Sequence, residues 1–305
     1  MIKPKVIVIG GPTASGKTKL GIELAKKING EIVSADSMQI YKEMDIGTAK
    51  PDIEEMQGIK HYMIDFINPD ESYSVADYKR DAKNAIKEIL EKGKVPIVVG
   101  GTGLYIDSLI YEIEYLDIKT DMNYRKKLEE RAEKEGLEIL YNEAMAIDKD
   151  ATELISRNDK KRILRILEIY HQTGKTKTEL DKNSRKEPEY DYKVFAIDME
   201  RDILYERINK RVDLMIENGL IAEVENVYKK YKKFPTSMQA LGYKEVVLYL
   251  ENKIAKDEMI EMIKRETRRY AKRQLTWFRK NKQTIWINGL DEVEKNICII
   301  LEEIK

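Results

Sequence analysis

The sequence contains few of the residues that build disulfides and metal sites. Among its 305 residues there is one cysteine, Cys298, and there are two histidines, His61 and His171. One cysteine forms neither an internal disulfide nor a thiolate zinc site, so we expect a reducing compartment, the cytoplasm. The two histidines have no partners at metal-ligand spacing, and neither is assigned a role.

Long apolar runs and a net charge are also missing. No stretch approaches the roughly 18 consecutive apolar residues that span a bilayer, and the N-terminus shows no small-residue cleavage site. We therefore expect a mature, soluble chain with no membrane partner. The 55 basic residues equal the 55 acidic ones, so any binding of nucleic acid must depend on local charge. Hydrophobic residues make up 42% of the chain, which excludes a wholly disordered protein and suits one large domain or two ordinary ones.

The first third of the chain alternates between strand and helix patterns. The β-branched run 5–9 ends at two glycines and predicts a strand that is buried on both faces. Further strands are expected at 31–35, 61–66 and 95–99. Helices are expected at 18–28 and after Ser74, a typical N-cap residue. This alternation predicts the α/β class: a parallel P-loop sheet flanked by helices, with right-handed crossovers.

The pattern changes to Lys- and Glu-rich helices from residue 113 onward. We interpret 113–190 as a helical insertion domain, and 1–112 with 191–305 as a P-loop core domain that ends in helices. Strands return at 193–197 and 284–288. The polar stretch 174–191 has almost no core-forming residues and is expected to be an exposed linker.

The clearest motif is a phosphate loop, residues 11–18, between the first strand and the first helix. Its glycines let backbone amides converge on a phosphate, Lys17 adds a positive charge, and Thr18 offers a hydroxyl to Mg²⁺. A glycine-rich turn without a ligand is the alternative. No strand ends in the acid that accompanies this loop in ordinary NTPases, and Asp65 is the nearest substitute. The predicted diphosphate-binding residues here are Gly11, Pro12, Thr13, Ala14, Ser15, Gly16, Lys17 and Thr18.

Two other strands also end in polar residues. Asp36 follows the second strand, and Thr102 lies among glycines after the strand at 95–99. The carboxyl ends of parallel strands face the ligand crevice, so both residues should lie near Lys17. Asp36 could accept a proton there, or it could simply cap a turn. The glycines around Thr102 indicate either close approach by a ligand or a tight turn.

Basic residues gather in the C-terminal part. Arg207 and Arg211 share a helix face and could clamp a diphosphate, although a solvated face with ion pairs is the usual reading. Residues 264–282 contain nine Lys or Arg against one Glu, a local net charge of +8. Trp277 and other aromatics interleave with this charge, which suits unpaired RNA bases, or a helix whose aromatic side chains face the core.

Together these motifs resemble the bacterial tRNA dimethylallyltransferases, also called tRNA isopentenyltransferases, over nearly the whole chain. The region 113–150 has little beyond Arg125 to anchor the resemblance. Ile166 stands where a small alanine is expected, and the zinc finger of eukaryotic members is absent. The blocks that carry the resemblance, in family order, are GPTASGKT, ADSMQIY, GGTGLY, NDKKRILRILE, MQALGYKE and AKRQLTWFRK.

The resemblance implies a reaction and a role for each motif. Members of the family transfer the dimethylallyl group of dimethylallyl diphosphate to the exocyclic N6 amine of the adenosine 3′ to the anticodon. Asp36 would be the general base and Thr102 would orient the reaction. Lys17 and Arg211, with Arg207, would stabilise the diphosphate, and Mg²⁺ would bind Thr18.

The resemblance also implies contacts with the anticodon stem-loop of tRNA. We expect a monomer. Two alternatives remain: a P-loop kinase of a nucleotide or small metabolite, and a non-catalytic RNA-binding module with a vestigial phosphate loop. The residues expected to contact tRNA are Asp36, Ser37, Met38, Gln39, Thr102, Arg125, Lys161, Arg162, Arg165, Gln239, Gly242, Tyr243, Lys244, Lys272, Arg273 and Trp277.

Overall fold

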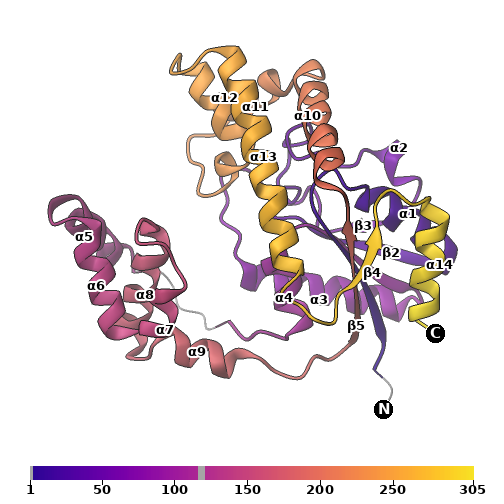
Figure 1. Ribbon diagram of the computed structural model, residues 1–305, viewed down its shortest axis with the longest axis horizontal. Helices are drawn as coiled ribbons and strands as arrows, with labels where there is room; N and C mark the ends of the chain where they lie inside the picture. The colour runs from indigo at the N-terminus through magenta and orange to yellow at the C-terminus, as the bar shows by residue number, and fades with distance from the viewer. Residues whose placement is uncertain (1–2, 116–120) are drawn as a thin grey trace. The chain divides into compact units, whose positions relative to one another are not determined.

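The computed structural model describes residues 3–115 and 121–305, and its strands form one parallel sheet (Figure 1). The strand order is β3-β2-β4-β1-β5-β6, and every neighbouring pair is parallel. This confirms the predicted α/β sheet. The strands are β1 (Lys5–Gly10), β2 (Gly30–Ala35), β3 (His61–Tyr62), β4 (Val95–Gly100), β5 (Asp191–Asp198) and β6 (Ile285–Asn288).

The sheet carries an apolar layer on each face because alternate residues of each strand point to opposite sides. Ile7 and Ile9 of β1 pack with α1 and α14 on one face. Val6 and Val8 pack with α3 and α4 on the other. Ser74 caps α3, and its hydroxyl oxygen accepts the backbone N–H of Asp77. These helices are α1 (Lys17–Ile28), α3 (Val75–Glu91), α4 (Gly103–Ile110) and α14 (Val293–Glu303).

The third strand is shorter than the apolar pattern at 61–66 predicts. β3 ends at Tyr62, and the next residues include Met63 at φ 62° and Asp65 at φ 57°. Left-handed backbone cannot continue an extended ladder, so the chain leaves the sheet at this point. A short helix, α2 (Ile53–Met56), precedes the strand.

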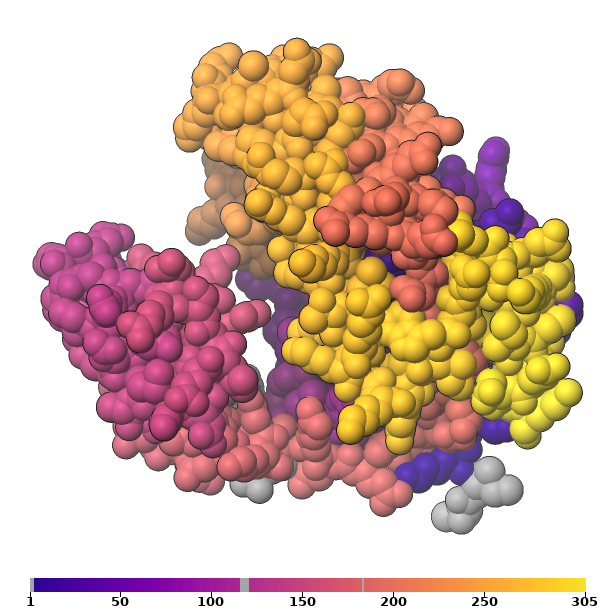
Figure 2. Space-filling view, in the orientation of Figure 1, coloured from indigo at the N-terminus to yellow at the C-terminus, as the bar shows by residue number. Residues whose placement is uncertain are grey.

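The C-terminal helices form a further apolar cluster with the loop that follows β2. Met44 and Tyr243 are completely buried in it. Figure 2 shows the face of the molecule on which α13 is exposed. No helix in the described part of the chain combines the length and apolar character needed to cross a bilayer. The elements of this cluster are α10 (Arg201–Glu217), α11 (Leu220–Lys230), the 3-10 helix η1 (Ser237–Gln239), α12 (Tyr243–Leu250) and α13 (Lys256–Phe278).

The chain divides into two compact units. The first is Met1–Ile110 with Pro188–Lys305, and the second is Tyr111–Glu187, where the sequence pattern placed an insertion at 113–190. The second unit is helical and has its own core, which includes Leu128 and Ile163. Its helices are α5 (Met122–Lys134), α6 (Leu137–Ile147), α7 (Lys149–Glu153), α8 (Lys160–Thr173) and α9 (Lys177–Ser184).

The prediction of an exposed linker at 174–191 is wrong in part, because this segment contains α9. Thr176 caps this helix: its side chain accepts the backbone N–H of Glu179, and the Glu179 carboxylate accepts the N–H of Thr176. This capping box starts a helix without a strong apolar pattern.

Candidate active site

The phosphate loop turns sharply between β1 and α1. Ala14 and Gly16 both have left-handed backbone, with φ 62° and φ 93°. The Ser15 hydroxyl and the Lys17 ammonium donate to the Pro12 carbonyl at 2.8 and 2.5 Å. Within the described residues, no side chain caps the start of α1. Its first amides are therefore left for an anion, as the motif predicts.

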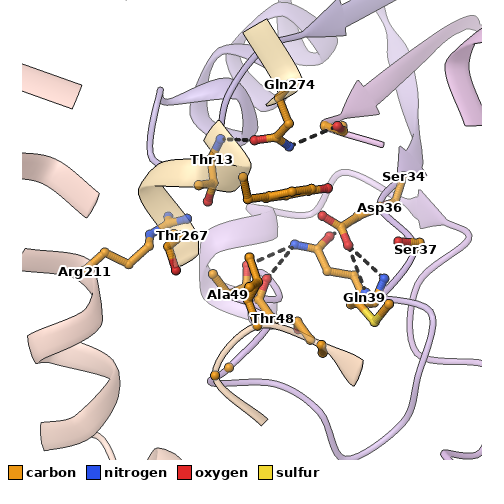
Figure 3. Close-up of a pocket in the computed structure, with 18 of the residues that line it drawn as sticks. Thr13, Ser34, Asp36, Ser37, Gln39, Thr48, Ala49, Arg211, Thr267 and Gln274 are labelled. Atoms are coloured by element: carbon orange, nitrogen blue, oxygen red, sulfur yellow. Dashed lines mark hydrogen bonds between the residues drawn. The ribbon is translucent and has the colours of Figure 1, made fainter. Parts of the chain in front are cut away.

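The carboxyl ends of the central strands open into a cavity of about 330 Å³ within the first unit. This is the position at which parallel sheets bind ligands. Residues from the phosphate loop, from the segment after β2 and from α10 and α13 all line it (Figure 3). The predicted site residues that line the cavity are Thr13, Lys17, Thr18, Asp36, Ser37, Met38, Gln39, Arg211, Gln239, Gly242, Lys244 and Arg273.

Asp36 lines the cavity, and its carboxyl group is turned toward it (Figure 3). Its Oδ1 accepts the backbone N–H groups of Met38 and Gln39 at 2.9 and 3.3 Å. Loss of hydration raises the pKa of Asp36 above its ordinary value of 3.8, against the two backbone bonds and the charge of Lys17, which lower it. The residue therefore shapes a turn and also presents a carboxyl group whose basicity is increased.

Lys17 and Arg211 are brought close enough to influence each other. The pKa of Lys17 falls from 10.5 to about 7, first through loss of hydration and second through the positive charge of Arg211. The charge of Asp36 opposes this shift. Two cations that repel each other at one cavity are stabilised by an anion placed between them.

The side chain of Thr102 joins the end of β4 to the segment after β2. Thr102 Oγ1 accepts the backbone N–H of Ser37 at 3.1 Å and lies 3.4 Å from the Ser37 hydroxyl. Tyr270 of α13 lines the cavity nearby. The pKa of Tyr270 is raised to about 12 by loss of hydration and by the charge of Asp36, while contacts with Thr102 and Gln274 oppose the shift.

The loop at 45–49 forms another wall of the cavity and is held from two sides. The Gln39 amide donates to the carbonyls of Thr48 and Ala49 at 3.2 and 3.1 Å. From α11, the Glu223 carboxylate accepts the backbone N–H groups of residues 45, 46 and 47 at 2.9, 2.7 and 3.0 Å. The loop is therefore tied both to the segment after β2 and to the C-terminal helices.

Other predicted site residues are not part of the cavity lining. Arg207 is exposed one turn before Arg211. Tyr243 is fully buried, and its hydroxyl donates to Glu223. Trp277 packs against Gly103, where a Cβ would come within 2.3 Å of the indole. Among the described residues of the first unit, the predicted site residues that the cavity lining does not include are Gly11, Pro12, Ala14, Ser15, Gly16, Thr102, Arg207, Tyr243, Lys272 and Trp277.

The remaining predicted contacts belong to the second unit. Arg125 and Arg165 form ion pairs with Glu168 at 3.4 and 3.5 Å, and Glu168 is completely buried. Lys161 and Arg162 are exposed in the first turn of α8. These side chains belong to one helical unit, in which a buried carboxylate holds two of the arginines.

Three features of the cavity have no clear signal in the sequence. His61, which was assigned no role, lines it. Gln274 lines it and bonds to the phosphate loop, and Glu223 supports its wall. Asp65, the nearest substitute for the acid of ordinary NTPases, pairs with Lys50 at 2.7 Å and does not line the cavity.

The model of the family described as IPP transferase matches residues 39–281. The tRNA dimethylallyltransferase of Acetivibrio thermocellus is 55% identical over 97% of this chain and 95% of its own. That of Carboxydothermus hydrogenoformans is 50% identical over 95% of this chain and 94% of its own.

The solved structures that this chain resembles are also transferases of this kind. The tRNA isopentenylpyrophosphate transferase of Bacillus halodurans is 43% identical, with a TM-score of 0.74 over 99% of this chain and 96% of its own. A eukaryotic dimethylallyltransferase, described as acting on tRNA, is 31% identical, with a TM-score of 0.82 over 99% of this chain and 79% of its own. With its phosphate loop, its cavity and these relatives, the chain belongs to the IPP transferase family.

Proposed function

We propose that this protein is a tRNA dimethylallyltransferase, which moves the dimethylallyl group of dimethylallyl diphosphate to the N6 amine of the adenosine 3′ to the anticodon. One observation carries the proposal: the carboxyl group of Asp36 and the cations Lys17 and Arg211 converge on one cavity. A diphosphate and a proton are the two products that such a reaction must remove.

The proton goes to Asp36. As the N6 nitrogen bonds to the allylic carbon, the bond from that carbon to the diphosphate oxygen breaks, and the nitrogen loses a proton. An adenine amine is a weak nucleophile because its lone pair is delocalised into the ring, so a base at this position assists the attack. Loss of hydration raises the pKa of Asp36, which makes its carboxylate a stronger base.

Positively charged groups and backbone N–H donors at the cavity stabilise the negative charge of the departing diphosphate. The amides at the start of α1, the ammonium of Lys17 and the guanidinium of Arg211 face the cavity. Preorganised donors of this kind stabilise a transition state without having to reorient. The phosphate loop would therefore bind a leaving group rather than a nucleotide substrate.

Mg²⁺ fits this site only as a partner of the diphosphate. Within residues 3–115 and 121–305, no three acidic, histidine or cysteine side chains gather as a protein metal site requires. The Thr18 hydroxyl lines the cavity beside the phosphate loop. Mg²⁺ commonly keeps several waters and binds substrate phosphates with few protein ligands. Bound there, it would neutralise part of the diphosphate charge.

The RNA side of the proposal depends on α13. Lys272 and Arg273 are exposed on this helix, and Arg273 also lines the cavity. Cations there would neutralise backbone phosphates beside the site of transfer. The target adenine must leave its stack to reach the cavity, as for other enzymes that act on a base.

We further propose a cytoplasmic monomer. The single cysteine, Cys298, is exposed and free, which suits a reducing compartment.

The test is intact-mass analysis of an unmodified anticodon stem-loop incubated with the protein, Mg²⁺ and dimethylallyl diphosphate. We expect a gain of one dimethylallyl group. Asp36→Asn keeps an oxygen that can accept the two backbone N–H groups but is a far weaker base, so its kcat should fall by about 10²–10⁴-fold.

The matched control is Asp52→Asn. Asp52 also accepts a backbone N–H, that of Glu55, at the start of α2, and it does not line the cavity. Its variant should keep wild-type activity. If Asp36→Asn were equally active, Asp36 would be a turn residue only. If the wild type modified no RNA but transferred phosphate from ATP, the kinase alternative would replace the proposal.

A further inference from the structure

A buried glutamine of α13 bridges two loops of the sheet. Gln274 Oε1 accepts the backbone N–H of Thr13 at 2.8 Å, and its Nε2 donates to the carbonyl of Gly101 at 2.9 Å (Figure 3). The residue is 5% exposed. One side chain therefore joins the phosphate loop, the end of β4 and the basic helix.

The position of this side chain is fixed by close packing. A Cβ on Gly101 would lie 2.0 Å from Gln274 Nε2. The helix that carries it is anchored in its last turn, because Phe278 packs against Gly10 so closely that a Cβ there would lie 2.2 Å from the ring. Gln274 has no room to change rotamer without moving the loop or the helix.

This contact determines which amides of the phosphate loop can meet an anion. Pro12 has no N–H, and the N–H of Thr13 is given to Gln274. The carbonyl of Pro12 in turn accepts from Ser15 and Lys17. The first half of the loop is thus held by the protein, and the amides from Ala14 onward are the ones offered to a phosphate.

We propose that Gln274 is a positioning residue of the diphosphate site. It orients the peptide of Thr13, holds the phosphate loop against the end of β4, and so sets the shape in which the later amides bind diphosphate. This inference rests on the proposed function, because it assigns the loop to dimethylallyl diphosphate. It does not require Gln274 to touch the substrate.

The test compares Gln274→Met and Gln274→Ala with the wild type. Methionine keeps the length of the side chain and removes both hydrogen bonds. We expect KM for dimethylallyl diphosphate and the calorimetric Kd for inorganic pyrophosphate with Mg²⁺ to rise about tenfold, the scale expected when a buried bonding partner is lost. KM for the anticodon stem-loop should stay within about twofold of the wild-type value.

The matched control is Asn296→Ala in α14. Asn296 is a buried amide, 4% exposed, whose Nδ2 donates to the Asn288 carbonyl at 2.9 Å, and it does not line the cavity. Its loss should lower Tm and leave both KM values unchanged. Melting curves of all variants show which of them are folded.

The outcomes separate the two proposals. The positioning role would be overturned if a folded Gln274→Met variant kept the wild-type KM for dimethylallyl diphosphate and Kd for pyrophosphate. A variant that, like the control, showed only a lower Tm would overturn it in the same way. If the wild type itself neither bound pyrophosphate nor modified the stem-loop, the proposed function would fail instead.

Discussion

Glu223 is the residue outside the proposed chemistry whose loss should have a large effect on the cavity. Its carboxylate accepts three consecutive backbone N–H groups of the loop at 45–47, at 2.7 to 3.0 Å, and the hydroxyl of Tyr243. Glu223→Ala leaves those three amides without their acceptor. The loop includes Gly47, which lines the cavity.

The size of the effect follows from these bonds. Hydrogen bonds to a charged group contribute about 1.5–3 kcal/mol each. Water replaces the carboxylate at the exposed amide of residue 45. The part-buried amides of residues 46 and 47 each lose a bond at the low end of that range, so we expect Glu223→Ala to cost about 3 kcal/mol. Glu223→Gln keeps an acceptor oxygen and loses the charge, and should cost about 1 kcal/mol.

The assay is chemical denaturation together with hydrogen exchange at the amides of residues 45–47. Exchange there should accelerate in Glu223→Ala before global unfolding. Glu225→Ala is the control, because Glu225 lies on the same helix and pairs with exposed Lys229. If Glu223→Ala matched this control within about 0.5 kcal/mol and the loop amides exchanged as slowly as in the wild type, the reasoning would be refuted.

Three further predictions concern other parts of the chain. Lys17→Met should raise Tm at pH 7, because folding lowers the pKa of Lys17 from 10.5 to about 7. Between these two pH values the unfolded chain holds a proton that the folded chain has lost, so the stability of the wild type rises with pH. The difference in Tm between the variant and the wild type should therefore shrink toward pH 10. A difference in Tm that does not change with pH would contradict this. Gly10→Ala should cost about 2 kcal/mol by overpacking against Phe278, and adding Phe278→Leu should recover part of the loss in denaturant titrations. Glu168→Gln should destabilise the helical unit by about 2 kcal/mol, because two arginines lose a buried partner. Glu143→Gln, which removes a half-exposed partner of Arg131, should cost clearly less in the same melts, and an equal cost would show that burial of Glu168 is unimportant.

Much of the fold could be predicted because local sequence and tertiary structure agree. The β-branched residues of β1 are buried on both faces, and Ser74 caps α3 as its sequence indicates. The prediction failed where backbone conformation departed from the pattern. Met63 and Asp65 adopt left-handed backbone within an apolar run, and α9 begins at a capping box in a polar segment.

Some residues of the site could likewise be predicted from the sequence, and others could not. Lys17 and Asp36 could be selected because parallel strands bring their carboxyl ends to one edge, where both residues line the cavity. Gln274 and Glu223 could not be selected, because their partners are backbone amides 261 and 178 residues away in the chain. Any residue supplies a backbone N–H, so such partners leave no mark in the sequence.

The central place of β1 in the sheet has a consequence for synthesis on the ribosome. This strand is made first, yet one of its edges is covered by β5, whose pairing begins at Asp191, and Gln274 follows later still. At about 5–20 residues per second, the phosphate loop waits on the order of tens of seconds for its last support. We therefore expect nascent chains that stop before residue 274 to carry the complete phosphate-loop sequence without the hydrogen bond that holds its Thr13 peptide in place.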